Sequence, residues 1–285
     1  MLKVVGDYMR LMHNMASLST YRTYKKSLVA QSSSMNNIST GLKVSAAKDD
    51  PSALSKSESI KMKIRSLQMA SRNAQDSISL IQTTEGGLDE VSNCLQRMRE
   101  LTIQSSGINT EEEKDMINKE IEQLKKGIND LVNNTSMNNV NVINGNLTKS
   151  LKVPSGANSG EYIEIPVTNM NLDVFPSGEN SDMNLQDVNL NDVEKSLSII
   201  DESINKLSLH RGKLGGVSNR FESCYNDLEE ISVRLESADS SLVDADVATE
   251  MMNLAKSDVL VTAGISIMKQ TNSFPQDILK ILQGI

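Results

Sequence analysis

The side chains that could carry catalysis or hold a metal ion are few and far apart in this sequence. His13 and His210 are its two histidines, and neither has a cysteine or carboxylate at the spacing of a metal site. We find no HExxH motif, nucleophile elbow, phosphate loop or dinucleotide fingerprint. We therefore expect a protein that is not an enzyme, with no catalytic residue, bound metal or cofactor.

Two acidic groups have simpler explanations than catalysis or calcium binding. Glu111–Glu113 follow Thr110, a pattern typical of a helix N-terminus, where carboxylates are favourable. Asp244 and Asp246 could ligate calcium, but their position before an apolar row favours a helix start or a contact between helices. We expect both groups to shape the ends of helices.

The two cysteines, Cys94 and Cys224, lie next to or on apolar stripes. They could be small buried hydrophobic side chains or the two halves of a disulfide. If long helices pack antiparallel with residues near 106 and 190 level, Cys94 lies opposite a position near 202. Cys224 is then displaced by about 22 residues, roughly 33 Å along a helix, whereas a disulfide needs α-carbons within about 7 Å. We expect two free thiols.

The composition argues against several classes of protein. The 285 residues include no tryptophan, five tyrosines and three phenylalanines, so a compact core rich in aromatic side chains is not expected. The net charge of −8 is spread along the chain, which argues against a nucleic-acid binder. No run of about 18 apolar residues could span a membrane. The N-terminus lacks the apolar core of a cleavable signal peptide, and by that test alone the protein would be cytoplasmic.

The rest of the chain is organised around residues 71–104, where apolar side chains recur at helical spacing. Their gaps are mostly three, four and seven, and three upstream residues continue the same stripe. One helix of more than about 40 residues would span roughly 60 Å, wider than a globular core, so other long helices must cover it. The stripe consists of Ile60, Ile64, Leu67, Ala74, Ile78, Ile81, Leu88, Val91, Leu95, Met98 and Leu101.

The positions of the prolines leave room for these partner helices. About a hundred residues on either side of a middle cluster contain almost no proline, as long helices require. We expect helices over residues 11–42, 52–106, 110–134 and 190–240. The five prolines are Pro51, Pro154, Pro166, Pro176 and Pro275.

The last third of the chain carries the strongest helical signal. Apolar residues recur there at an unbroken interval of seven, which indicates coiled-coil packing rather than a globule. A further apolar row runs from Val247 to Met268, and Pro275 should break that helix. The row of sevens consists of Ile200, Leu207, Leu214, Phe221, Leu228, Leu235 and Leu242.

The β signals of the chain lie between residues 140 and 180. Leu151–Val153 and Tyr162–Val167 read as two short strands around a turn, and this region is too small to fold alone. The expected fold class is therefore mainly α, with long helical hairpins that form a coiled-coil rod and a small β-hairpin region in the middle.

Several segments together resemble bacterial flagellin, the subunit of the flagellar filament. The resemblance covers about residues 9–150 and 190–283, and departs from the family at the first eight residues and at the ending LQGI. The segments that carry it are MRLMHNMASL, ISTGLKVSAAKDDPSAL, ASRNAQDSISLIQTTEGGLDEV, LQRMRELTIQ, HRGKLGGVSNRF, VDADVATEM, AGISIMKQTN and PQDIL.

The resemblance implies an assembly. The terminal helices would pair and line the inner tubes of a filament, and the long hairpins would form a rod outside them. Residues 1–50 and 241–285 would be the two halves of a filament-core helical domain, and residues 51–240 would be the rod domain. Neighbouring subunits would cover apolar surface in head-to-tail contacts that do not close. The expected assembly residues are Leu18, Leu28, Met35, Leu42, Val247, Met251, Leu254, Val261, Ile265 and Met268.

The resemblance also implies a location and partners. Family members leave the cell unfolded through the flagellar type III export apparatus, so the protein would be extracellular, in the bacterial flagellum filament, without a cleavable signal peptide. Its expected partners are further copies of itself, a flagellar export chaperone, the filament cap and hook–filament junction proteins. It would bind no nucleic acid and have no membrane span.

Host Toll-like receptor 5 recognises family flagellins through the segment that matches LQRMREL and the helix that follows. Carried over by position, this points to Arg97, Leu101 and Glu120. The alternative is that Leu101 is a core residue and Arg97–Glu120 an ordinary surface ion pair, worth about 0–1 kcal/mol.

Two other functions stay open at this point. A hook–filament junction protein shares the terminal architecture, but it lacks so full a match to residues 71–88 and does not polymerise into long fibres. A cytoplasmic coiled-coil adaptor would carry the heptads alone. Electron microscopy of concentrated protein separates them, since long uniform fibres indicate a filament subunit and soluble rods of fixed size indicate either alternative.

Overall fold

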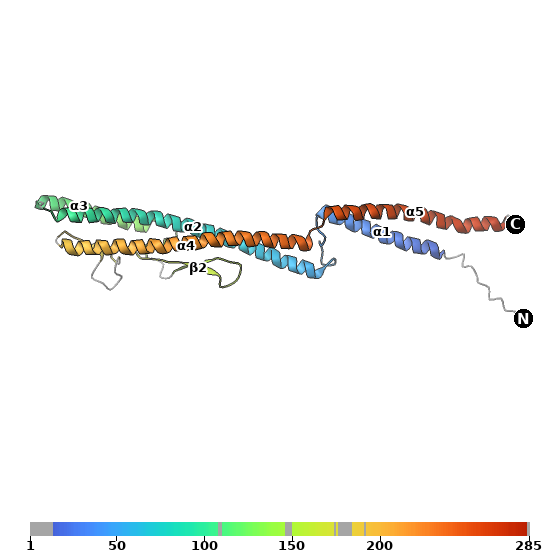
Figure 1. Cartoon of the computed structure of the whole chain (residues 1–285), viewed down its shortest axis with the longest axis horizontal. Helices are drawn as coiled ribbons and strands as arrows, with labels where there is room; N and C mark the ends of the chain where they lie inside the picture. The colour runs from blue at the N-terminus through green and yellow to red at the C-terminus, as the bar shows by residue number, and fades with distance from the viewer. Residues whose placement is uncertain are drawn as a thin grey trace. The chain divides into compact units, whose positions relative to one another are not determined.

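The computed structural model describes residues 14–107, 110–145, 150–173, 175, 184–190 and 192–283, with side chains described up to residue 273. Within these residues it contains five long α-helices and a two-stranded antiparallel sheet, which confirms the mainly α fold class (Figure 1). His13 and the eight-residue lead lie outside the described residues. The elements are α1 (Met15–Thr40), α2 (Pro51–Ser105), α3 (Glu111–Asn134), β1 (Leu151–Pro154), β2 (Tyr162–Ile165), the 3₁₀ helix η1 (Leu185–Asp187), α4 (Val193–Val243) and α5 (Val247–Gln283).

The bounds of α5 correct one expectation. The helix continues through Pro275 to Gln283, so the break expected at this proline is wrong. A proline removes one backbone hydrogen bond and can bend a helix, but the helix continues where the residues on both sides stay helical.

The chain divides into two compact units, and both boundaries fall inside helices. Unit 1 comprises Met1–Lys61 and Leu235–Ile285, and unit 2 comprises Met62–Arg234. The boundaries expected from the sequence, at residues 50 and 240, lie instead close to the loops between helices. The functional division into a filament-core domain and a rod domain therefore stays a prediction.

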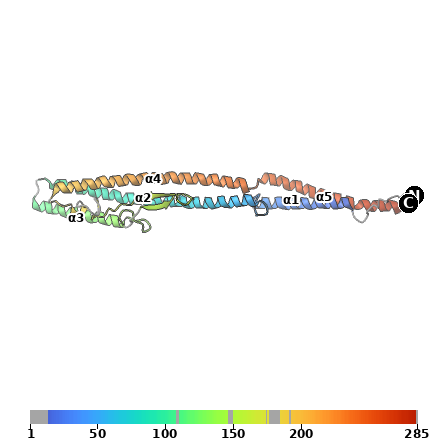
Figure 2. The ribbon, with the colours of Figure 1, turned by 90° about the horizontal axis from the view of Figure 1, so that it is seen from below.

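In unit 2, α2 and α4 lie side by side and antiparallel (Figure 2). The Arg99 Nε atom lies 2.7 Å from an Asp201 carboxylate oxygen, and Arg211 lies 3.0 Å from Asp89, ten residues along each helix. Eighteen residues further, the Ser71 hydroxyl donates a hydrogen bond of 3.1 Å to Glu229. Equal steps along the two helices mean that they stay in one register throughout this unit.

This register confirms the free thiols and corrects the expected alignment of the helices by one turn. Cys94 lies level with position 206 rather than 202, because α4 begins at Val193 and its first turn lies level with the end of α2. Cys224 is then displaced by about 18 residues, roughly 27 Å. Both cysteines are free thiols.

The row of sevens on α4 forms one wall of the unit 2 core. Its five members in this unit are almost fully buried, and the first four belong to one hydrophobic core with the stripe of α2. Burying each such side chain contributes roughly 1.5–3 kcal/mol relative to leaving it exposed. The five are Ile200, Leu207, Leu214, Phe221 and Leu228.

Helix α3 packs against α2 and is fixed at both ends. At its start the Thr110 hydroxyl and the Glu113 carboxylate form the expected capping box. At its end the Asn141 side-chain amide donates hydrogen bonds of 2.8 Å and 3.2 Å to the Val132 and Asn133 carbonyls. Between them, the buried Lys125 ammonium donates hydrogen bonds to the carbonyls of Gln186 and Val188, which fastens the segment around η1 to α3.

The small sheet lies against α4. In the antiparallel hairpin, Leu151 pairs with Ile165 and Pro154 with Tyr162, so the expected second strand ends at Ile165 rather than Val167. The Cys224 thiol donates to the Ser155 carbonyl oxygen, 3.2 Å away. The Thr168 hydroxyl lies 2.6 Å from His210 Nδ1. These contacts satisfy the expectation that the β region leans on the helices.

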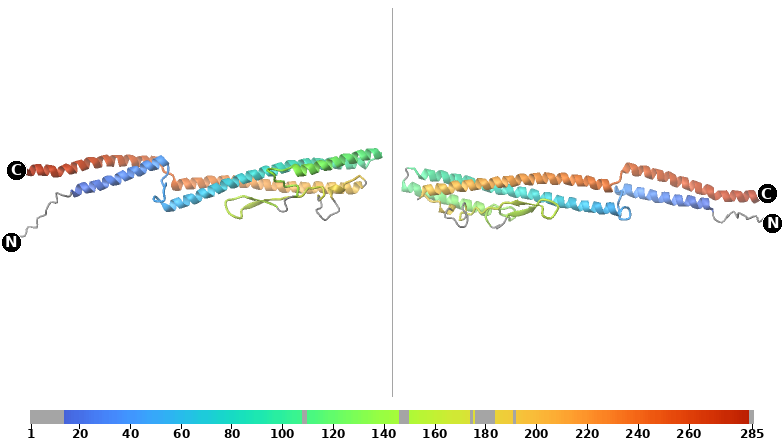
Figure 3. Two further views of the ribbon diagram at one scale, coloured as in Figure 1. Left: turned by 180° about the vertical axis from the view of Figure 1, so that it is seen from behind. Right: turned by 60° about the horizontal axis from the view of Figure 1, so that its bottom comes forward.

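In unit 1, α1 and α5 lie side by side and are joined at one end by backbone hydrogen bonds (Figure 3). Gly41 ends α1 with a positive φ of 72°, which glycine adopts without strain. The Lys43 amide donates to the Val243 carbonyl and the Ala245 amide to the Gly41 carbonyl. Asp246 accepts hydrogen bonds from the Ala248 amide and the Thr249 hydroxyl, which confirms its interpretation as a helix start.

Candidate interaction surfaces

The most deeply buried side chains of α1 and α5 are small and polar. Three of the described side chains on these two helices are buried, two on α1 and one on α5. All three are serines: Ser27, Ser34 and Ser257. Small serines allow a close approach of the two helices, but they bury little apolar area. Hydrophobic burial between the two helices is therefore weak.

Side-chain hydrogen bonds supply much of the remaining contact between these helices. The Asn14 amide donates a hydrogen bond of 2.8 Å to the Thr271 carbonyl, and the Asn37 amide lies 3.3 Å from Glu250. Gln31 bonds to Asp258 between them. Such bonds exchange with water and contribute about 1 kcal/mol each at most when exposed.

The apolar side chains of the same two helices lie on the outside. The exposed large hydrophobic residues of α5 lie on several sides of the helix. Met252 and Val259 are on the side opposite Ser257, and Met251 and Leu260 are on the two flanks between. Charged residues such as Lys256 and Asp258 lie among them, but exposed large apolar side chains in this number mark an interaction surface. The exposed members are Met15, Leu18, Tyr21, Leu28, Val29 and Met35 on α1, and Val247, Met251, Met252, Val259, Leu260, Ile265 and Ile267 on α5.

The expected assembly residues occupy two positions in this arrangement. Leu18, Leu28, Met35, Val247, Met251 and Ile265 are exposed, whereas Leu254, Val261 and Met268 recur every seven residues and are half-buried, as is Leu42 in the loop after α1. Sequence reasoning missed Met252, Val259, Leu260 and Ile267. The prediction followed one apolar row along α5 and overlooked the other apolar residues. A count of apolar residues around the whole helix would have found them.

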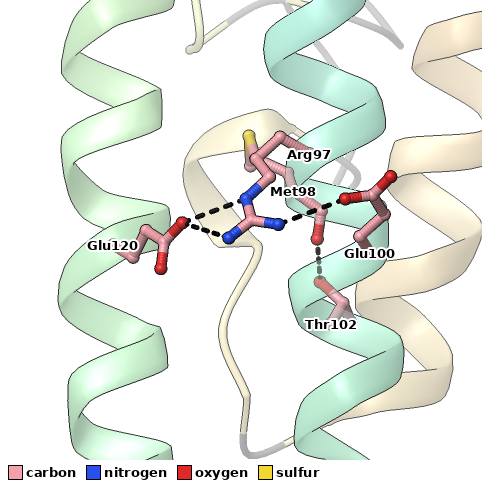
Figure 4. A network of polar contacts seen from close by, with 5 residues as sticks. All are labelled: Arg97, Met98, Glu100, Thr102 and Glu120. Atoms are coloured by element: carbon pink, nitrogen blue, oxygen red, sulfur yellow. Dashed lines mark hydrogen bonds and ion pairs between the residues drawn. The ribbon is translucent and has the colours of Figure 1, made fainter.

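A second surface is formed by α2 and α3 in unit 2. The Arg97 guanidinium donates from Nε and Nη2 to one Glu120 carboxylate oxygen, at 3.0 Å and 2.9 Å, and its Nη1 lies 3.2 Å from Glu100 (Figure 4). Arg97 and Glu120 are each about half exposed. An exposed pair of this kind contributes about 0–1 kcal/mol to stability.

The structure separates the three residues that the resemblance singled out. Arg97 and Glu120 meet on the surface, but Leu101 is 2% exposed and belongs to the hydrophobic core. Leu101 can therefore affect this surface through packing, whereas the Arg97–Glu120 pair is accessible to a partner.

Three titratable side chains in the described part of unit 2 have shifted pKa values that follow mainly from burial. Burial, with a smaller contribution from neighbouring carboxylates, raises the pKa of the Cys94 and Cys224 thiols, so both are protonated near neutral pH. Burial and then the charge of Lys213 lower the pKa of His210 to about 4. Across the described residues, no group of three or more His, Cys, Asp or Glu side chains could hold a metal ion.

No helix in the described part of the chain is long and apolar enough to cross a membrane.

The sequence matches one protein family over most of its length. A model of the bacterial flagellin N-terminal helical region matches residues 11–148, and a model of the C-terminal helical region matches residues 197–282. The flagellin of Halalkalibacterium halodurans is 35% identical over 95% of this chain and 98% of its own. The flagellin of Bacillus subtilis is 33% identical over 96% of this chain and 100% of its own. The flagellar filament 31.3 kDa core protein of Treponema maltophilum is 31% identical over 95% of this chain and 99% of its own.

One solved structure supports the fold. A putative flagellar hook-associated protein from Vibrio parahaemolyticus superposes with a TM-score of 0.57, at 15% identity over 69% of this chain and all of its own. A flagellin of Bacillus cereus gives a TM-score of 0.47 at 26% identity, over 55% of this chain and 88% of its own. The first likeness shows the fold alone, whereas the sequence likeness to filament proteins extends over nearly the whole chain.

Proposed function

The chain belongs to the bacterial flagellin family, the structural subunits of extracellular flagellar filaments rather than enzymes, and we propose that it polymerises through the exposed apolar sides of α1 and α5. The observation that carries this proposal is the arrangement of unit 1, with serines between the two helices and large apolar side chains outside. Exposed apolar area of this extent is unfavourable in water and marks an interaction surface.

Further copies of the same chain are the partners that fit this surface. Each copy contributes the outward sides of both helices, so a copy that covers one side leaves another side free for the next copy. Contacts of this kind are head-to-tail and generate a helical polymer when they do not close. The four expected assembly residues that are half-buried would hold α1 and α5 together within a subunit, and the exposed ones would join subunits.

Export and the other partners of the filament follow from the same family. The proposal is that the chain leaves the cell unfolded through the flagellar type III apparatus, and that its partners include an export chaperone, the filament cap and hook–filament junction proteins. The support is family membership and the physics of α5. The large apolar side chains that α5 exposes would bind nonspecifically inside a cell unless a partner covered them before assembly.

Recognition by Toll-like receptor 5 is a separate proposal, centred on Arg97 and Glu120. Its support is the match to LQRMREL and the exposure of this ion pair on the α2–α3 surface. In this proposal the receptor contacts Arg97 and Glu120, and Leu101 maintains the surface from below because it is in the core.

The assembly proposal is tested by making the outward side of α5 polar. In the double variant Met252→Ser/Val259→Ser, two side chains that are 66% and 68% exposed change, so the subunit should stay folded. The matched control is Met116→Ser/Leu209→Ser, at 66% and 67% exposure on unit 2. Sedimentation and electron microscopy should show filaments for the control and none for the α5 variant. Filaments from the α5 variant, or an equal loss in the control, would contradict the proposal.

A further inference from the structure

Methionine provides much of the exposed apolar surface of unit 1. Met15 and Met35 on α1, and Met251 and Met252 on α5, are between 54% and 69% exposed. By contrast, Met98 and Met170 in unit 2 are at most 1% exposed. The thioethers that lie on the proposed contact are therefore open to small reagents in the free subunit.

Methionine has a reactivity that the neighbouring leucine, isoleucine and valine side chains lack. A lone pair on the thioether sulfur attacks one oxygen of hydrogen peroxide, and the O–O bond breaks. The sulfur is oxidised to a sulfoxide, and the peroxide is reduced to water. The reaction converts a flexible apolar side chain into a polar one.

The same four side chains have to lose their contact with water when subunits join. A sulfoxide oxygen is a hydrogen-bond acceptor, and burying it without a donor is unfavourable. The residues one turn from Met251 on α5 are Val247, Ala248, Leu254 and Ala255, which offer no side-chain donor, whereas Thr249 and Lys256 lie one turn from Met252. Oxidation and assembly therefore compete for one surface.

We propose that Met15, Met35, Met251 and Met252 form an oxidation-sensitive site, at which hydrogen peroxide modifies free subunits and blocks their addition to a filament. This inference rests on the proposed contact through α1 and α5. Subunits already in a filament resist the reaction, because their neighbours cover the four sulfurs. A methionine sulfoxide reductase restores a subunit that can assemble: two thiols supply the electrons and become a disulfide, and the sulfoxide oxygen leaves as water.

The thiols do not explain such an effect. Cys94 and Cys224 are half-buried, and their raised pKa values keep them in the less reactive thiol form. Treatment with dithiothreitol after the peroxide reduces disulfides and sulfenic acids but leaves methionine sulfoxide in place, which separates the two chemistries.

The test compares full-length subunits before and after peroxide, followed by dithiothreitol. Mass spectrometry maps the sulfoxides, and sedimentation measures the polymer. One variant replaces all four methionines of the site by leucine, which conserves apolarity and nearly conserves volume. The matched control replaces Met62, Met69 and Met116, which are between 55% and 66% exposed on unit 2. Two further variants replace only Met15 and Met35 on α1, or only Met251 and Met252 on α5. They provide a variant that assembles if the four-leucine variant does not.

Peroxide should reduce the sedimenting fraction of the wild-type chain and of the control at least tenfold. Each variant is compared with its own untreated sample: peroxide should leave the sedimenting fraction of the four-leucine variant at its untreated level, and should reduce that of each pair variant less than that of the wild type. Equal inhibition of the four-leucine variant and the wild type would overturn the oxidation site. A different result overturns the underlying contact: oxidation of the four methionines at the same rate in filaments as in free subunits would show that neighbours do not cover them.

Discussion

Replacing Leu101 and Arg97 separately distinguishes a core residue from a surface residue in the proposed receptor site. Leu101 is 2% exposed among apolar neighbours, so Leu101→Ala removes buried methyl groups and leaves a cavity. The expected loss in the free energy of unfolding is about 2–5 kcal/mol. Arg97 makes a half-exposed ion pair with Glu120, so Arg97→Ala should cost about 0–1 kcal/mol.

Thermal unfolding measured by circular dichroism gives the first comparison. At about 2–4 °C per kcal/mol for a unit of this size, Leu101→Ala should lower the unfolding temperature by roughly 4–20 °C, and Arg97→Ala by no more than a few degrees. Receptor signalling in reporter cells gives the second. Arg97→Ala and Glu120→Ala should both weaken signalling by the folded monomer while filament formation persists. Unchanged signalling in both surface variants would remove the receptor assignment, and an unchanged unfolding temperature for Leu101→Ala would contradict its place in the core.

Three further predictions test other parts of the account. Deleting the chain after Ala245 should leave a soluble, helical monomer that forms no filaments, as measured by sedimentation and circular dichroism. A truncated chain that polymerises, or that loses most of its helix, would contradict this prediction. Thiol counting on denatured, non-reduced monomer should find two free thiols, Cys94 and Cys224. A count of zero free thiols would contradict the register of α2 and α4. The pKa of His210 is lowered to about 4, so its neutral form stabilises the fold fully above pH 6.5, and this contribution is lost as the pH falls from 6.5 towards 4. Between pH 7 and pH 5 the loss should be on the order of 1–2 kcal/mol, measured by urea unfolding, and a His210→Gln variant with the same pH dependence would refute the assignment.

The long helices could be predicted from sequence because their apolar spacing is local and regular. The row from Ile200 to Leu228 is buried as expected, and the capping box at Thr110 marks the start of α3. The prediction of a break at Pro275 failed because a proline can bend a helix without ending it when the residues on both sides stay helical. The one-turn error in register arose because loop geometry, which sequence spacing does not encode, sets where α4 begins.

The candidate surfaces were harder to predict than the helices. The sequence placed apolar rows on α1 and α5, but it could not show that serines would occupy the interface between them. Pairing two apolar rows is the ordinary expectation for adjacent helices, whereas here the row Leu254, Val261 and Met268 is only half-buried and other large apolar side chains are exposed. Similarly, the motif around Arg97 named three residues, and only three-dimensional packing assigns Leu101 to the core.

Hydrogen–deuterium exchange of α5 in free subunits and in filaments tests the central claim most directly. Polar contacts with α1 bury little apolar area, so amides between Val247 and Thr271 should exchange readily in the monomer. In filaments, neighbouring copies cover the outward side of the helix and the same amides should become protected. Amides of α2 and α4 around the buried row should be protected in both states. Strong and equal protection of α5 in monomer and filament would contradict assembly through this helix.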